Sequence, residues 1–237
     1  MVGGGSATRP TGKELLLVLG IDHGLDLDGQ AVEVDEAGGI LLVVIRLRDP
    51  ESMETLHSFG ISGPRTLVTA DPALLMEGDD RAAERILREN GLDPDGRYCL
   101  FVLRPWDGTR ERLREIAAAA DYCREKYGLM PLFYTLEPGR DDEITRTAAS
   151  MVKAPCQILP PIADGRALCG LMGRMALVVS MRLHALVFAC ARQTRVAAIS
   201  YDPKVSGFMG YLGSECCVEL HQVTENAMRD LIFGDTN

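Results

Sequence analysis

An arginine and a histidine, Arg182 and His184, stand two positions apart where a predicted strand passes into a predicted helix. The strand, Met175–Ser180, is almost entirely apolar, and the residues after it place apolar side chains at the spacing of one helix face. Parallel sheets bind ligands beyond the carboxyl ends of their strands, and the unpaired N–H groups of a helix's first turn favour an anion. A fixed cation beside a titratable imidazole therefore predicts a site for a phosphate or a carboxylate.

Two further cations follow other strands of the predicted sheet. Arg104 comes directly after the strand Tyr98–Leu103, and Lys204 comes shortly after the strand Arg195–Ser200. Because the carboxyl ends of parallel strands share one edge, these cations could converge with the first pair on one crevice. An arginine fork suits this chemistry, since it donates two parallel hydrogen bonds to a phosphate or a carboxylate.

Each of these residues also has an ordinary structural explanation. His184 could be a packed or capped histidine, and Arg182 could pair with a surface carboxylate. Asp202 is accounted for as a helix N-cap, and Lys204 as a solvated residue of the first turn. Trp106, the only tryptophan, would more often be a core anchor than a stacking platform.

Other catalytic arrangements have less support. Ser180, His184 and Asp202 could be combined into a Ser-His-Asp triad, but no nucleophile-elbow motif supports it. The other three of the four histidines show no metal-ligand spacing, and no acidic cluster is suited to a divalent ion. The sequence therefore predicts a site without a metal.

Strands and helices alternate through the second half of the chain. The strands are predicted at Tyr98–Leu103, Leu132–Thr135, Cys156–Leu159, Met175–Ser180, Arg195–Ser200 and Cys216–Leu220. One helix is predicted over Thr109–Tyr127 and ends at Gly128, and another over Pro203–Leu212 begins at the N-cap Asp202 and ends at Gly213. This alternation predicts parallel βαβ units in a doubly wound α/β sheet.

The first part of the chain has fewer elements. A strand, a helix, a strand and a helix are predicted at Ile40–Leu47, Asp49–Phe59, Arg65–Thr69 and Asp79–Glu89, and no firm element is predicted at 7–39. We therefore divide the chain into a partial N-terminal α/β domain at 1–78 and a C-terminal domain at 79–237 that would bind the anion.

The composition restricts the class of protein. A net charge of −9 without a basic block argues against nucleic-acid or anionic-membrane partners, and the longest apolar run, Ala185–Ala191, is too short to span a bilayer. The N-terminal segment lacks the features of a signal peptide. The seven cysteines form no CxxC pair and predict reduced, packed thiols, so we expect a cytoplasmic protein.

Two motifs resemble those of the polysaccharide pyruvyl transferase family of the CsaB type. They are Ser180–Ala189, which contains Arg-Leu-His, and Ile199–Val205, which contains Ser-Tyr-Asp-Pro-Lys. Weaker matches are Gly3–Ser6, Arg48-Asp49 with Ser52, Thr69–Ala73, Leu103–Trp106 and the pair Asp141 and Asp142. The resemblance extends from about Arg46 to the C-terminus.

The resemblance implies a GT-B-like fold of two Rossmann-like domains facing a cleft, with a shortened N-terminal domain. It implies transfer of pyruvate from phosphoenolpyruvate to sugar hydroxyls as a ketal, without a cofactor. His184 would be the catalytic residue. The substrate-binding residues would be Arg104, Arg182, Leu183, Tyr201, Asp202 and Lys204. Partners would be phosphoenolpyruvate, a glycan or lipid-linked saccharide, and either a second copy of the chain or a separate N-terminal-domain protein.

Two other functions fit the same residues. A nucleotide-sugar glycosyltransferase of the GT-B type also binds an anionic donor mainly in its C-terminal half. An inactive binding subunit would keep the anion pocket and lack the acceptor site. The identity of the donor separates the first alternative from pyruvyl transfer.

Overall fold

The computed structural model describes residues 32–34, 40–42, 44–47, 50–60 and 65–233. The chain forms two compact units, divided between Asp71 and Pro72. This division comes before the predicted domain boundary at 78/79, because Ala73 and Met76 already pack against the core of the second unit.

The first unit contains two small sheets and a helix. Strands β1 (Val32–Val34) and β2 (Ile40–Leu42) are antiparallel, whereas β3 (Val44–Leu47) and β4 (Arg65–Val68) are parallel and are joined through α2 (Pro50–Ser58). The strand predicted over 40–47 is thus present as β2 and β3, and β1 lies in the stretch where no element was expected. The glycine run at 3–6 and the Arg-Asp pair at 48–49 lie outside the described residues.

A six-stranded parallel sheet forms the centre of the second unit, in the order β10-β9-β8-β5-β6-β7. The strands are β5 (Tyr98–Val102), β6 (Met130–Phe133), β7 (Gln157–Ile158), β8 (Leu177–Ser180), β9 (Val196–Ser200) and β10 (Cys217–Glu219). The chain adds β6 and β7 on one side of β5, then crosses to add β8, β9 and β10 on the other. This is the doubly wound Rossmann order, and its switch point lies between β5 and β8.

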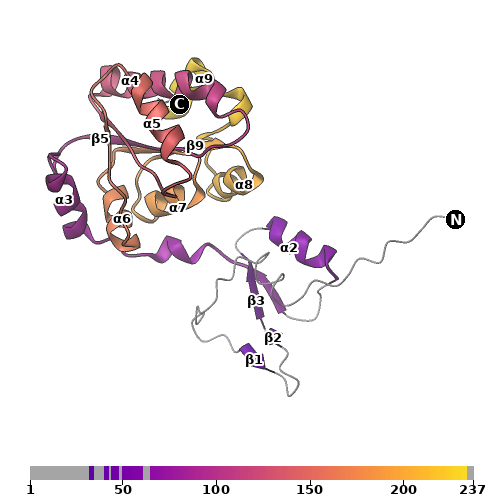
Figure 1. Ribbon diagram of the computed structural model, residues 1–237. Coiled ribbons are helices and arrows are strands. Elements are labelled where there is room, and N and C mark those ends of the chain that lie inside the picture. The colour runs from indigo at the N-terminus through magenta and orange to yellow at the C-terminus, as the bar shows by residue number, and fades with distance from the viewer. Residues whose placement is uncertain (1–31, 35–39, 43, 48–49, 61–64, 234–237) are drawn as a thin grey trace. The chain divides into compact units, whose positions relative to one another are not determined.

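Helices cover both faces of this sheet (Figure 1). They are α3 (Asp80–Glu89), α4 (Leu113–Tyr127), α5 (Asp142–Met151), α6 (Gly165–Met172), α7 (Leu183–Ala191), α8 (Pro203–Tyr211) and α9 (Glu225–Phe233). Phe101 faces a core shared with α4, α5 and α9, whereas its neighbour Leu100 faces a second core shared with α3, α6 and α7. Because both faces are covered, the central strands read as continuous apolar runs. None of the helices in the described part of the chain combines the length and hydropathy needed to cross a membrane.

The predicted elements of this unit are present, with shifted ends. Gly128, in the left-handed region at φ 66°, is the C-cap of α4. Asp202 is the N-cap of α8, and its side chain accepts from the backbone N–H of Lys204. Strand β6 begins earlier than predicted, at Met130. The backbone N–H groups of Met130 and Tyr134 donate towards the neighbouring strand β5, so the nitrogen of Pro131 faces the other neighbour, β7. Because β7 pairs only with the two residues after the proline, no ladder bond needs the missing N–H. All seven cysteines lie in the described residues and none forms a disulfide.

A glycine in α6 allows a close approach to the start of α3. A methyl group at Gly170 would lie only 2.7 Å from the carbonyl carbon of Asp79, whereas one at Gly207 in α8 would meet nothing within 4 Å. We expect Gly170→Ala to lower the free energy of unfolding by about 1–3 kcal/mol through overpacking. Gly207→Ala should raise it by up to about 1 kcal/mol. Urea unfolding of both variants checks this, and equal stabilities would contradict the close approach.

Candidate active site

The candidate site lies at the switch point of the parallel sheet. The carboxyl ends of β5 and β8 are adjacent there, and the chain continues from them into Arg104 and Arg182. In open α/β sheets the ligand crevice lies outside the carboxyl ends of the strands at this point. The fold thus places both arginines where the sequence analysis expected a ligand.

Arg104 is held against two aromatic rings from distant parts of the chain. Its Nη1 donates a hydrogen bond of 2.6 Å to the Tyr201 hydroxyl. Its guanidinium carbon lies 5.3 Å from the centroid of the Trp106 ring and 5.1 Å from that of Tyr201. The Lys204 ammonium lies 5.8 Å from the same tyrosine ring. We call Arg104, Trp106, Tyr201 and Lys204 the cationic cluster.

Within the described residues, no carboxylate balances the positive charge of Arg104. Its Nε is buried and makes no hydrogen bond there, and none of the described ion pairs includes its guanidinium. A buried polar atom without a partner is uncommon in folded proteins, and a bound ligand is one of its explanations. Lys204 differs, because its Nζ lies 3.5 Å from Asp202 Oδ2. The Asp202 carboxylate also caps α8, so its structural role is observed directly.

Arg182, by contrast, is buried and paired. Its Nε donates to Asp141 Oδ2 at 2.9 Å, one Nη donates to Asp141 Oδ1, and the same Nη donates to Glu137 Oε2 at 2.7 Å. Asp141 is fully buried. Burial alone would lower the pKa of Arg182, but the hydrogen bonds to these carboxylates raise it above its ordinary value. The hydrogen bond from Arg182 also lowers the pKa of Glu137.

The Ser180 hydroxyl fixes the turn between β8 and α7. It accepts from the backbone N–H of Arg182 at 2.8 Å and donates to the Arg182 carbonyl oxygen at 2.9 Å. The Val102 carbonyl oxygen of β5, 3.3 Å from the hydroxyl oxygen, is a second acceptor within reach. The side chain is fully buried. A hydroxyl used in this way is not presented as a nucleophile, which argues against the Ser-His-Asp alternative.

Leu183 and His184 lie in the first turn of α7, which follows β8. Because β8 lies between β5 and β9 in the sheet, this turn is next to the strand ends that carry the cationic cluster. The Leu183 side chain is buried, so only its backbone is available to a ligand, and N–H groups of a first turn lack acceptors within their helix. His184 is exposed, and its ring centroid lies 6.4 Å from that of Phe188.

The structure thus joins Arg104, Tyr201 and Lys204 by direct contacts and sets His184 at the neighbouring strand end. Two features differ from the sequence analysis. Trp106 is 45% exposed and so is not a core anchor. Glu111 and Glu219, which the sequence analysis did not single out, line a pocket beside the cationic cluster. They come from segments far apart in the chain, and neither belongs to a motif, so no sequence signal marks them.

One comparison with known proteins identifies a family, and another identifies the fold. A family model described as polysaccharide pyruvyl transferase matches residues 42–203, well over half of the chain. That range includes Arg104, Arg182 and His184 and ends just before Lys204. A search of curated proteins found no match.

Solved structures with a similar fold include several UDP-GlcNAc 2-epimerases. The Methanocaldococcus jannaschii enzyme, in complex with UDP-GlcNAc and UDP, has a TM-score of 0.52 and 13% identity over 83% of this chain and 56% of its own. The S. aureus MnaA–UDP structure has a TM-score of 0.58 and 13% identity over 81% and 52%. A putative enzyme from Listeria monocytogenes has a TM-score of 0.51 and 13% identity over 80% and 51%. The chain therefore has a GT-B-like fold and spans about half the length of these relatives.

Proposed function

The chain belongs to the polysaccharide pyruvyl transferase family, and from that premise we propose that it transfers pyruvate from phosphoenolpyruvate to sugar hydroxyls. The acceptor would be a precursor of a cell-wall or exported polysaccharide, free or lipid-linked, and the product a ketal. The family is a transferase family by its description, which supports an enzyme over an inactive binding subunit.

One observation carries the proposal: among the described residues, Arg104 is an uncompensated cation at the switch point of the sheet. Its buried Nε has no partner in that part of the chain, while the neighbouring Arg182 is already neutralised by carboxylates. Phosphoenolpyruvate carries a phosphate and a carboxylate, and an arginine fork binds either group through charge-assisted hydrogen bonds. The first-turn N–H groups of α7 add positive potential at the same edge, and Lys204, although paired with Asp202, lies against the Tyr201 ring.

The chemistry requires proton transfers and stabilisation of a departing anion. Protonation of the methylene carbon of phosphoenolpyruvate leaves a cationic centre at the carbon that bears the carboxylate and the phosphate. One sugar hydroxyl attacks this carbon and loses its proton. A second hydroxyl then attacks the same carbon and loses its proton while the bond to phosphate breaks, which closes the ketal. His184 would give or take these protons as the general acid–base residue. Arg104 would hold the donor and stabilise the phosphate as it leaves.

Arg182 contributes differently in this proposal. Because its guanidinium binds Asp141 and Glu137, we assign it a positioning role: it fixes the turn from which His184 projects. Its direct contact with phosphoenolpyruvate stays a prediction. We further propose that the reaction takes place in the cytoplasm, which the unpaired thiols support, and that it needs no metal or cofactor. A second copy of the chain or a separate N-terminal-domain protein stays a proposed partner.

The identity of the donor tests the proposal, since proteins with this fold include ones solved with UDP. Titration calorimetry of the full chain with phosphoenolpyruvate, and separately with UDP-GlcNAc, distinguishes the two donor classes. We expect heat of binding from phosphoenolpyruvate alone. Binding of UDP-GlcNAc without phosphoenolpyruvate would favour a nucleotide-sugar enzyme instead.

The same titration tests Arg104. We expect Arg104→Met to weaken phosphoenolpyruvate binding by about 2 kcal/mol, because hydrogen bonds to a charged group are lost. Arg114 is exposed on α4, and Arg114→Met is the matched control that should leave the affinity unchanged. An unchanged affinity in Arg104→Met would remove this residue from the donor site.

A further inference from the structure

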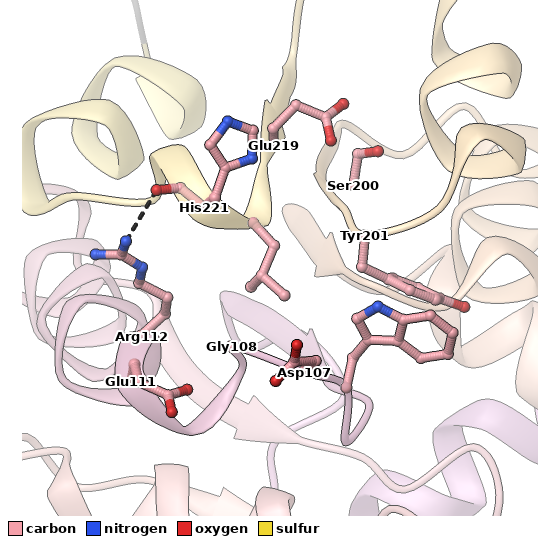
Figure 2. Close-up of a pocket in the computed structure, with 10 residues that line it drawn as sticks. Asp107, Gly108, Glu111, Arg112, Ser200, Tyr201, Glu219 and His221 are labelled. Carbon is pink, nitrogen blue, oxygen red and sulfur yellow. Dashed lines mark hydrogen bonds between the residues drawn. The ribbon is translucent and has the colours of Figure 1, made fainter.

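A pocket of about 320 Å³ opens beside the cationic cluster, beyond the carboxyl ends of β9 and β10 (Figure 2). One part of its wall is formed by Asp107 and Glu111, which follow β5. Another is formed by Glu219, the last residue of β10, and by His221 in the turn after it. The aromatic side chains of Trp106 and Tyr201 form a third part of the wall. Small-molecule sites occupy about 300–1,000 Å³, so the pocket has room for one small ligand.

The charge of this pocket differs from that of the cationic cluster. Asp107, Glu111 and Glu219 are acidic, and none of the three forms an ion pair with another described residue. One cation, Arg112, also lines the pocket, and the three carboxylates outnumber it; its Nη2 donates to the His221 carbonyl oxygen at 2.9 Å, as the dashed line in Figure 2 shows. An anion such as phosphoenolpyruvate is therefore repelled from this pocket, and a neutral or cationic ligand is favoured.

The remaining lining narrows the class of ligand. Among the described residues, no group of His, Cys, Asp and Glu side chains could hold a metal ion, so the pocket is not described as a metal site. Trp106 is 45% exposed, and its ring centroid lies 4.8 Å from that of Tyr201. An exposed aromatic face packs against the C–H face of a sugar ring. Carboxylates around it accept hydrogen bonds from several hydroxyls at once.

We propose that this pocket binds one neutral sugar unit of the acceptor saccharide. That the bound sugar belongs to the acceptor rests on the proposed function. That the pocket binds a sugar rests on the lining of the pocket alone. Trp106 and Tyr201 are shared between the pocket and the cationic cluster, so their ring pair separates an acidic sugar subsite from the basic donor site. The division keeps the anionic donor and the polyhydroxyl acceptor in separate places on one unit.

The protein provides its own reporter, because Trp106 is the only tryptophan in the chain. Methyl glycosides of the common hexoses and N-acetylhexosamines are titrated into the full chain while the tryptophan fluorescence is recorded. We expect a saturable change with at least one glycoside. Saturation-transfer NMR with the same glycosides gives a second readout that does not depend on the indole.

Charge-neutralising variants test whether the sugar binds in this pocket. Asp107→Asn and Glu219→Gln should each weaken glycoside binding by about tenfold, through loss of charge-assisted hydrogen bonds, without weakening phosphoenolpyruvate binding. Glu125→Gln, on the exposed surface of α4, is the matched control. The proposal is overturned if no glycoside binds by either readout, or if both pocket variants bind it as well as the control does.

The two proposals fail separately. Glycoside binding without phosphoenolpyruvate binding would leave the sugar pocket in place and reject the donor assignment. Phosphoenolpyruvate binding without glycoside binding would reject the sugar pocket and leave the donor site in place.

Discussion

Replacing Arg182 with methionine is expected to lower the free energy of unfolding by about 3–5 kcal/mol. The change leaves the carboxylate of Asp141 fully buried without its cation, and removal of one partner from a buried ion pair costs about this much. The side chain keeps its apolar volume, so the loss measures charge and hydrogen bonding more than packing. Urea unfolding followed by circular dichroism gives the value.

Two further variants test the cause of this loss. Asp141→Asn combined with Arg182→Met removes both charges while retaining an oxygen for the Glu137 backbone N–H, and should recover much of the stability. Arg110→Met breaks a surface ion pair in which the Arg110 side chain is 62% exposed and that of Glu143 is 70% exposed. This variant should leave the free energy of unfolding almost unchanged. If Arg182→Met were no more harmful than Arg110→Met, the buried pair would not support the site.

The second large effect concerns His184. We expect His184→Asn to reduce turnover by about a hundredfold to ten-thousandfold while phosphoenolpyruvate affinity stays within a few fold. Asparagine keeps a polar side chain on the exposed first turn of α7 but cannot exchange a proton at neutral pH. Initial rates of phosphate release with saturating donor, together with calorimetry, separate turnover from binding.

His57, exposed on α2, provides the control, and His57→Asn should retain full turnover. A His184→Asn protein that loses donor binding and turnover together would make His184 a residue that holds the ligand. A protein with unchanged turnover would remove it from the reaction.

Strong local signals allowed the sequence to predict where the residues of the candidate site lie in the fold. The apolar run that became β8 passes directly into α7, so Arg182 and His184 stand where they were expected. The alternation of strands and helices predicted the parallel sheet, whose strand ends gather Arg104 and Lys204. Tyr201 joins them through the hydrogen bond from Arg104, a contact between distant positions that the shared edge of the sheet made plausible.

The pairing and the burial of each side chain could not be predicted from the sequence as well as its position could. Arg104 and Arg182 look alike there, yet among the described residues one is uncompensated and the other neutralised. The difference arises because the segment after β6 carries Glu137 and Asp141 to Arg182. Trp106 was expected in the core because an isolated tryptophan usually packs there; instead it is 45% exposed and contacts Arg104 and Tyr201. Such outcomes depend on tertiary neighbours, which local patterns do not specify.

The acidic pocket was beyond sequence reasoning for a related reason. Its carboxylates come from the turn after β5 and from the end of β10, and these segments become neighbours only when the sheet is assembled. Likewise, the division of the chain between Asp71 and Pro72 follows from packing of the next residues onto the second unit, not from a linker composition.

Product analysis with carbon-13 phosphoenolpyruvate, labelled at the carbon that bears the phosphate, tests pyruvyl transfer most directly. The full chain is incubated with the labelled donor and a glycoside that binds it, and carbon-13 NMR is recorded alongside free phosphate. The account predicts a ketal carbon signal that grows in step with phosphate release and is abolished in His184→Asn. Phosphoenolpyruvate that stays intact with every bound glycoside, or that yields only free pyruvate, would contradict it.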